Sequence, residues 1–158
     1  MNKIFVFVAI FILGFGAAHA LSQLSMTEKP LSLNVISNPS APQGMLNSNN
    51  IQILNDRIII YIANSSLSRY AATGSMLPVL NEDSKGIKIP VTSPEQLHVG
   101  DIITYRDISS GDLIIHRIMS IGFDEVGTYY ILKGDNNFAG DGKVRFEQIV
   151  YKLVVLVY

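Results

Sequence analysis

Hydrophobic and polar positions divide the chain into three parts. An uninterrupted apolar stretch over residues 4–18 is followed by a stretch rich in Ser, Asn and Pro that ends near residue 50. From residue 51 onward, short β-branched runs alternate with clusters of Gly, Asn, Asp and Ser. Apolar runs bounded by such turn residues are typical of β-strands. The predicted strands cover residues 57–63, 68–73, 86–89, 101–106, 113–121, 128–133 and 149–157.

Many short strands at near-even spacing predict a mainly β domain, either a short-stranded sandwich or a partly open barrel. Outside the N-terminal apolar segment no stretch keeps a helical period over ten residues, so we expect one apolar helix, which precedes the β domain. We therefore divide the chain into three segments. Residues 1–21 form a membrane anchor or signal segment, residues 22–50 a flexible linker, and residues 51–158 the β domain.

The N-terminal segment has two interpretations. It follows Lys3 and ends in Ala18-His19-Ala20, which is the pattern of a cleavable secretory signal. Its apolar length is also just short of the roughly 20 residues that span a bilayer, so it could equally be a retained anchor, which we favour. In both cases the positive charge keeps Lys3 cytoplasmic. We therefore expect a single-pass protein of the cell membrane whose β domain lies on the extracytoplasmic side.

Composition narrows the function. The net charge of −1 and a pI near 6.3, without any run of Lys or Arg, exclude an electrostatic footprint for nucleic acid. Cysteine is absent and the three histidines lack ligand spacing, so we expect neither a metal site nor another cofactor. One glycosylation sequon begins at Asn64, although so short a pattern also arises by chance.

Four polar blocks of the β domain carry the candidate chemistry. They supply a hydroxyl, an imidazole and a carboxylate from separate segments, the groups needed for serine-based acyl transfer. The blocks are residues 73–78 (TGSMLP), 100–106 (GDIITYR), 114–118 (IIHRI) and 133–141 (KGDNNFAGD).

The candidate nucleophile is Ser75, because Gly74 before it permits a tight turn and a close approach of substrate. The candidate general base is His116, since imidazole titrates near neutral pH and can take up and return a proton. Alternatively, the serine is part of an ordinary turn and the histidine packs on its strand with both nitrogens satisfied. His19 and His98 are weaker candidates, because His19 lies at the end of the apolar segment and His98 precedes the turn at residues 99–101.

In content and order, these blocks resemble type I signal peptidases of the endoplasmic-reticulum and archaeal kind. The resemblance covers roughly residues 69–153. It implies a largely β catalytic core and a membrane-anchored serine endopeptidase that removes signal peptides from exported preproteins. It also implies a Ser-His-Asp arrangement where the common bacterial enzymes use Ser-Lys. Signal peptides, membrane lipid and accessory membrane subunits are the partners that this family suggests.

The resemblance also assigns roles. The essential carboxylate of the family lies six residues after the aspartate of its Gly-Asp-Asn block, which is Asp135 here, so Asp141 is expected to orient His116. Asp135 is expected to support the loop. Thr73 stands where bacterial relatives carry a serine hydroxyl, and is expected to act as an oxyanion donor beside the backbone N–H of Ser75. Alternatively, the two aspartates are ordinary turn residues and Thr73 is an ordinary strand residue.

Some features do not follow the family. Leu77 replaces its usual glutamate, and the apolar run around it either inserts into the membrane surface or packs in the core. Two lysines, Lys88 and Lys133, are alternative bases, but neither lies in the block that carries the bacterial lysine. We expect the substrate to add as a strand to the edge formed by residues 68–73. Two other functions stay open: a peptidase that cleaves itself or one partner, and a catalytically silent envelope β domain.

Overall fold

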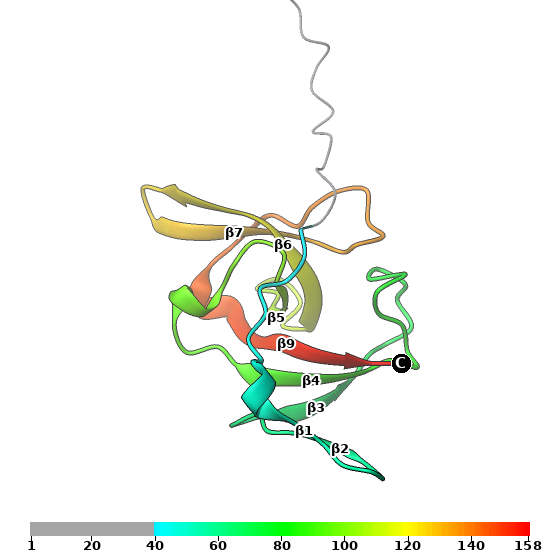
Figure 1. Cartoon of the computed structure of the whole chain (residues 1–158). Coiled ribbons are helices and arrows are strands. Elements are labelled where there is room, and N and C mark those ends of the chain that lie inside the picture. The colour runs from blue at the N-terminus through cyan, green and yellow to red at the C-terminus, as the bar shows by residue number, and fades with distance from the viewer. Residues whose placement is uncertain (1–39) are drawn as a thin grey trace, which may run out of the picture. The chain divides into compact units, whose positions relative to one another are not determined.

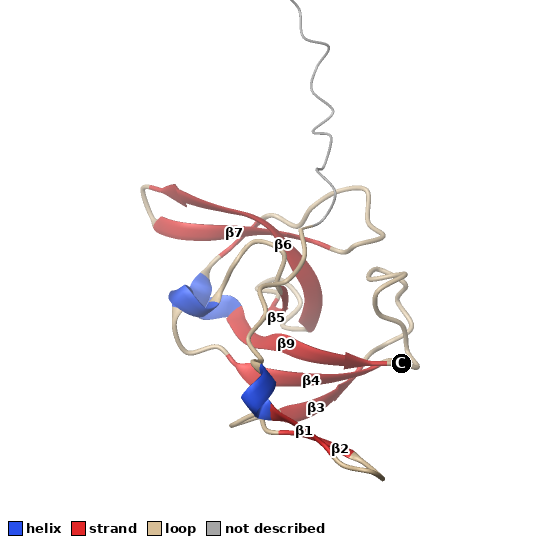
Figure 2. Cartoon of the chain, viewed as in Figure 1, coloured by secondary structure: helices blue, strands red, loops and turns tan. Residues whose placement is uncertain are grey.

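Seven antiparallel strands form one open sheet in the part of the chain that the structure describes. The computed structural model describes residues 40–158, so the N-terminal apolar segment and most of the predicted linker lie outside the described residues. The strand order is β3-β4-β9-β5-β6-β7-β8, and a separate two-stranded sheet pairs β1 with β2 (Figure 1, Figure 2). The mainly β class predicted from the sequence is confirmed.

The strands of the described residues are β1 (Ile51–Ile53), β2 (Ile58–Ile60), β3 (Ser66–Arg69), β4 (Lys85–Pro90), β5 (Ile102–Arg106), β6 (Leu113–Asp124), β7 (Gly127–Lys133), β8 (Lys143–Val144) and β9 (Ile149–Val157). Three short 3-10 helices complete these elements: η1 (Ser48–Asn50), η2 (Pro94–Gln96) and η3 (Phe146–Gln148). None of the helices between residues 40 and 158 is long and apolar enough to cross a membrane.

Each of the seven predicted strands overlaps an observed one, with one correction that matters for the site. The strand predicted over residues 68–73 is β3, which begins at Ser66 and ends at Arg69. Tyr70 leaves the sheet because its hydroxyl packs directly over Gly86, where a Cβ would lie 1.8 Å from that oxygen. The predicted substrate edge over residues 68–73 is therefore wrong beyond Arg69, and residues 70–84 form a loop instead.

Strand β6 is long enough to change partners along its length. Its first half pairs only with β5, and pairing with β7 begins at Arg117, which lies opposite Lys133. A register shift between Ile118 and Ser120 marks a bulge in the second half, and Figure 1 shows the strand curving through the middle of the fold. Residues 113–116 are consequently a free strand edge inside the sheet.

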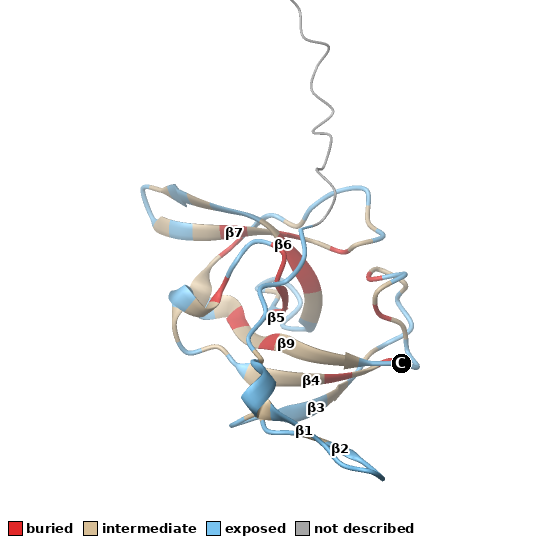
Figure 3. Ribbon diagram, in the orientation of Figure 1, coloured by how far each residue is buried: buried red, intermediate tan, exposed pale blue. Residues whose placement is uncertain are grey.

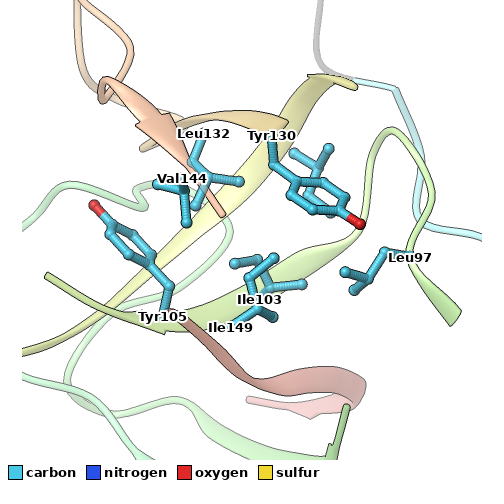
Figure 4. Close-up of a cluster of buried hydrophobic side chains, with 8 residues drawn as sticks. Leu97, Ile103, Tyr105, Tyr130, Leu132, Val144 and Ile149 are labelled. Carbon is cyan, nitrogen blue, oxygen red and sulfur yellow. The ribbon is translucent and has the colours of Figure 1, made fainter. Parts of the chain in front are cut away.

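Hydrophobic side chains pack on both faces of β5. Side chains alternate along a strand, so Ile103 and Tyr105 join one cluster while Ile102 joins another. Figure 4 shows the larger cluster, and Figure 3 shows that buried positions concentrate on the strands from β9 to β7. The smaller cluster holds Met76 and Leu80, so it anchors the loop that carries Ser75.

The described chain before β1 also packs against the domain. The backbone N–H of Gln43 donates to the Asp101 carboxylate at 3.2 Å, and a Cβ on Gly100 would lie 2.3 Å from the carbonyl oxygen of Ala41. Residues 40–158 all belong to one compact unit. Composition predicts that the domain begins at residue 51, whereas the compact unit already includes residues 40–50.

Candidate active site

His116 and Asp141 are in direct contact. The ring Nδ1 of His116 lies 2.5 Å from Oδ2 of Asp141. A carboxylate can only accept, so Nδ1 carries the hydrogen and donates it. In a neutral ring with this tautomer, Nε2 carries the free lone pair that a general base requires.

The histidine comes from the free edge of β6. His116 lies opposite Ile103 of β5, and its side chain is almost fully buried. Tyr105, two residues further along β5, donates its hydroxyl to the same Asp141 oxygen at 3.0 Å. In Figure 4 that hydroxyl points away from Ile103 and Ile149, out of the cluster. Burial, and then the Asp141 charge, raise the pKa of Tyr105, so the phenol stays protonated and continues to donate.

Ser75 lies at a tight turn in the loop between β3 and β4. Gly74 before it has φ of 72°, a left-handed conformation that favours glycine. Met76 after it is buried in the smaller cluster and fixes the turn to the sheet. The hydroxyl of Thr73 lies 3.3 Å from the Ser75 hydroxyl and accepts a hydrogen bond from the Ser75 backbone N–H at 3.4 Å. A hydroxyl and a backbone N–H therefore lie together beside the serine oxygen.

One loop contacts both halves of the site. It runs over residues 134–142, between β7 and β8, and carries Asp141 near its end. Near its start, the backbone N–H of Asn136 donates to the Ser75 carbonyl at 2.9 Å, and the Asn136 amide donates to the Gly74 carbonyl at 3.1 Å. The same segment therefore sets the position of both the nucleophile and the carboxylate behind His116.

An ion pair holds the start of this loop on the sheet. Arg117 of β6 makes two hydrogen bonds to Asp135, from Nε at 2.8 Å and from Nη2 at 2.7 Å, and both side chains are more than nine-tenths buried. Arg117 also donates to the carbonyl of Gly100 at 2.8 Å. The sequence predicts that Asp135 supports the loop, and the structure gives it an arginine as its side-chain partner. Its carboxylate is turned away from the His116 side of β6, since adjacent strand residues face opposite sides.

Ser75 and His116 line one cavity of about 440 Å³. Residues 68–71 at the end of β3 and residues 113–116 at the start of β6 line the same space, and Thr73 belongs to it as well. Within residues 40–158, no hydrogen bond joins the Ser75 hydroxyl to the His116 ring. The structure thus brings Asp141 to His116 and Thr73 to Ser75, and of these four residues Thr73, Ser75 and His116 line the cavity.

The alternative lysine bases are both engaged elsewhere. Lys133 donates to the carbonyl of Asn137 at 2.7 Å, within the 134–142 loop. Lys88 lines the cavity, and its ammonium lies 3.9 Å above the centre of the Tyr151 ring. A third lysine, Lys152, is buried and paired with Asp101 at 2.6 Å.

The described part of the chain contains no cluster of side chains that could bind a metal ion. Between residues 40 and 158, no group of three or more His, Cys, Asp or Glu side chains is arranged to hold an ion.

Comparison with known proteins does not identify a related protein, so the functional assignment depends on the geometry of the site. The chain matches no family model, no curated protein and no solved structure.

Four residues of the site were not singled out from the sequence. Tyr105 and Arg117 act through Asp141 and Asp135, while Gly134 and Asn136 touch the serine turn. All four lie inside the four polar blocks, and their position in these blocks is the sequence feature that could have identified them as site residues. Which partner each one contacts depends on loop conformation, and no spacing in the sequence encodes that.

Proposed function

We propose that this protein is a membrane-anchored serine endopeptidase that removes N-terminal signal peptides from exported preproteins. The contact between His116 and Asp141, beside a cavity shared with Ser75, is the observation that carries the proposal. A buried histidine whose Nδ1 is held by a carboxylate is the arrangement that converts a serine hydroxyl into a nucleophile. The order of the four polar blocks, and their resemblance to type I signal peptidases, support the choice of substrate.

The reaction begins with attack of the Ser75 hydroxyl oxygen on the carbonyl carbon of the scissile peptide bond. Nε2 of His116 takes the hydroxyl proton, and Asp141 stabilises the imidazolium that forms. Binding of the substrate closes the remaining distance between the serine and the histidine, since catalytic hydrogen bonds are often long in a free enzyme. The developing oxyanion accepts hydrogen bonds from the Thr73 hydroxyl and the Ser75 backbone N–H.

Collapse of the tetrahedral intermediate breaks the C–N bond and leaves an acyl ester on Ser75. The proton held by His116 goes to the leaving amine, which is the new N-terminus of the mature protein. A water molecule then attacks the ester, with His116 again acting as the base, and restores the free serine. Each proton and each bond is accounted for by these groups without a cofactor.

The free strand edge beside the cavity supports recognition of an extended peptide. Residues 113–116 offer a free strand edge to which a substrate strand can add its backbone hydrogen bonds. Met76, Leu80 and Ile115 form apolar packing beneath the serine turn. A preference for Ala, Gly or Ser at the positions before the cleaved bond is implied by the resemblance to type I signal peptidases.

A cleavage assay tests the proposal. The full chain is reconstituted in lipid vesicles and incubated with a preprotein that ends its signal peptide in Ala-x-Ala, and the product mass identifies the cleaved bond. We expect cleavage after the second alanine by the parent protein, and none by Ser75→Ala. Replacing that alanine by leucine in the preprotein should block the parent as well. A folded parent that cleaves no preprotein would favour a catalytically silent β domain.

A further inference from the structure

Lys88 brings a positive charge to the cavity that Ser75 lines. It belongs to β4, and strand register places it opposite Leu153 of the neighbouring strand β9. The Lys88 ammonium lies 3.9 Å above the centre of the ring of Tyr151, which is two residues from Leu153 along β9. Residues opposite one another in an antiparallel pair share a face, and so do positions two apart on one strand. The side chain of Lys88 is therefore held on one defined face of the sheet.

The wall of this cavity contains basic residues and no carboxylate. Its lining includes Lys88, Arg69 and His116 but no Asp or Glu. Arg69 lies opposite Lys85, three positions before Lys88 on β4, so its side chain belongs to the other face of the sheet. No ion pair in the described part of the chain involves Lys88. The ring of Tyr151 is neutral, so it contacts the ammonium without cancelling its charge.

Two hydroxyl-bearing residues lie on the same face as Lys88. Ser68 of β3 lies opposite Gly86, which is two residues before Lys88 on β4. Thr104 of β5 lies opposite Tyr151, whose ring contacts the ammonium. Both Ser68 and Thr104 line the cavity. An ammonium and hydroxyl groups on one wall are suited to bind a carboxylate, because charge-assisted hydrogen bonds are strong and are screened less in a half-buried site than in bulk water.

We propose that Lys88 is a specificity-determining residue that binds the carboxylate of an Asp or Glu side chain in the substrate segment occupying the cavity. This inference deepens the proposed function and rests on it. A bound peptide removes water from the ammonium, and a charged group that loses water without gaining a partner costs free energy. A carboxylate on the peptide offsets that cost, whereas a neutral side chain does not. The preferred substrates are therefore preproteins with an acidic residue close to the cleaved bond.

Peptide binding to a variant that cannot cleave tests this inference without requiring turnover. The full chain carrying Ser75→Ala is purified in detergent, and fluorescent peptides that span the cleavage region of a preprotein are titrated by anisotropy. Paired peptides differ only in Asp against its isostere Asn, placed at each position around the bond in turn. Lys88→Met removes the ammonium and keeps a side chain of similar length. Lys85→Met is the matched control, because Lys85 belongs to the same strand, faces the other side of the sheet and does not line the cavity.

We expect the Asp peptide to bind about 10-fold more tightly than the Asn peptide for at least one position, and this preference to weaken as the salt concentration rises. The preference should disappear with Lys88→Met, persist with Lys85→Met and with Lys88→Arg, and invert with Lys88→Glu. Equal affinities for every pair, or no binding of any peptide, would overturn the proposal. A preference that survives Lys88→Met, or that Lys85→Met abolishes equally, would overturn it as well.

The proposed function is tested separately, by cleavage of the same peptides with the chain that retains Ser75. Cleavage without any preference for Asp in binding refutes only the role of Lys88. A preference for Asp that depends on Lys88, without cleavage, refutes only the peptidase.

Discussion

Gly134 lies directly against the carbonyl of Ser75: a Cβ on Gly134 would be 2.5 Å from the Ser75 oxygen. The first glycine of the 134–142 loop is therefore required by the closeness of the two backbones, independently of any conformational preference. The backbone N–H of Asn136 donates to the same carbonyl at 2.9 Å. Any side chain larger than hydrogen at position 134 has to displace the serine turn.

The substitution Gly134→Ala should consequently impair catalysis more than folding. A displacement of about 1 Å at a reacting group lowers turnover by about 10²-fold, so we expect a kcat for preprotein cleavage reduced by that order. Gly142→Ala, in the same loop, is the matched control, since nothing lies within 4 Å of its Cβ position. Equal turnover by the two variants would contradict the role of this contact.

Asp141→Asn should lower kcat by about 10⁴-fold while leaving substrate binding intact. The amide can still contact Nδ1 of His116, but it neither fixes the productive tautomer nor stabilises the imidazolium. KM and the circular dichroism spectrum report whether binding and fold survive. Tyr105→Phe removes the other hydrogen bond to Asp141 and leaves the carboxylate in place, so a much smaller loss is expected from it. Turnover by Asp141→Asn close to that of the parent would remove Asp141 from the mechanism.

Asp135→Asn should destabilise the domain through Arg117. Removing one partner of a buried ion pair leaves the other charge uncompensated, which costs about 3–5 kcal/mol. Urea unfolding followed by circular dichroism measures the change in the free energy of unfolding. Asp56→Asn breaks the exposed Arg57 pair and should leave this free energy unchanged, because exposed pairs contribute little. A fall of the same size in both variants would show that the buried pair has no special role.

Stability should decline at alkaline pH, in part because of Tyr105. Burial raises the pKa of its phenol in the folded protein, whereas an unfolded tyrosine titrates near pH 10. Its contribution is therefore fully present below about pH 10 and is lost as the pH rises above that value, since only the unfolded chain releases the proton.

The free energy of unfolding, measured between about pH 8 and pH 11, should fall less steeply for Tyr105→Phe than for the parent. Burial also raises the pKa values of Tyr70 and Tyr130, so part of the slope should persist in the variant. Identical slopes for the parent and Tyr105→Phe would contradict the assigned direction.

The sequence predicted the strands better than it predicted their ends. β-branched runs between turn residues located β2 to β7 and β9, because such residues are enriched in strands. Two short strands, Ile51–Ile53 and Lys143–Val144, were missed, since two or three residues show no alternation. The early end of β3 was missed because it depends on Tyr70 packing over Gly86, a contact distant in sequence.

In the candidate site too, the residue types could be predicted from the sequence, whereas their contacts could not. A hydroxyl, an imidazole and a carboxylate could be selected from residue chemistry and from the spacing of the blocks. The partner of Asp135 could not, because Arg117 reaches it only after β6 and the 134–142 loop meet on the sheet.

The most direct test of the central claim, that Ser75 and His116 act as one catalytic unit, is a double-mutant cycle on preprotein cleavage. The kcat/KM is measured for the parent, for Ser75→Ala, for His116→Ala and for the variant that carries both substitutions. Because residues of a catalytic unit are grossly non-additive, we predict that the double variant is no slower than either single variant. Losses that multiply in the double variant, or a Ser75→Ala protein as active as the parent, would contradict the account.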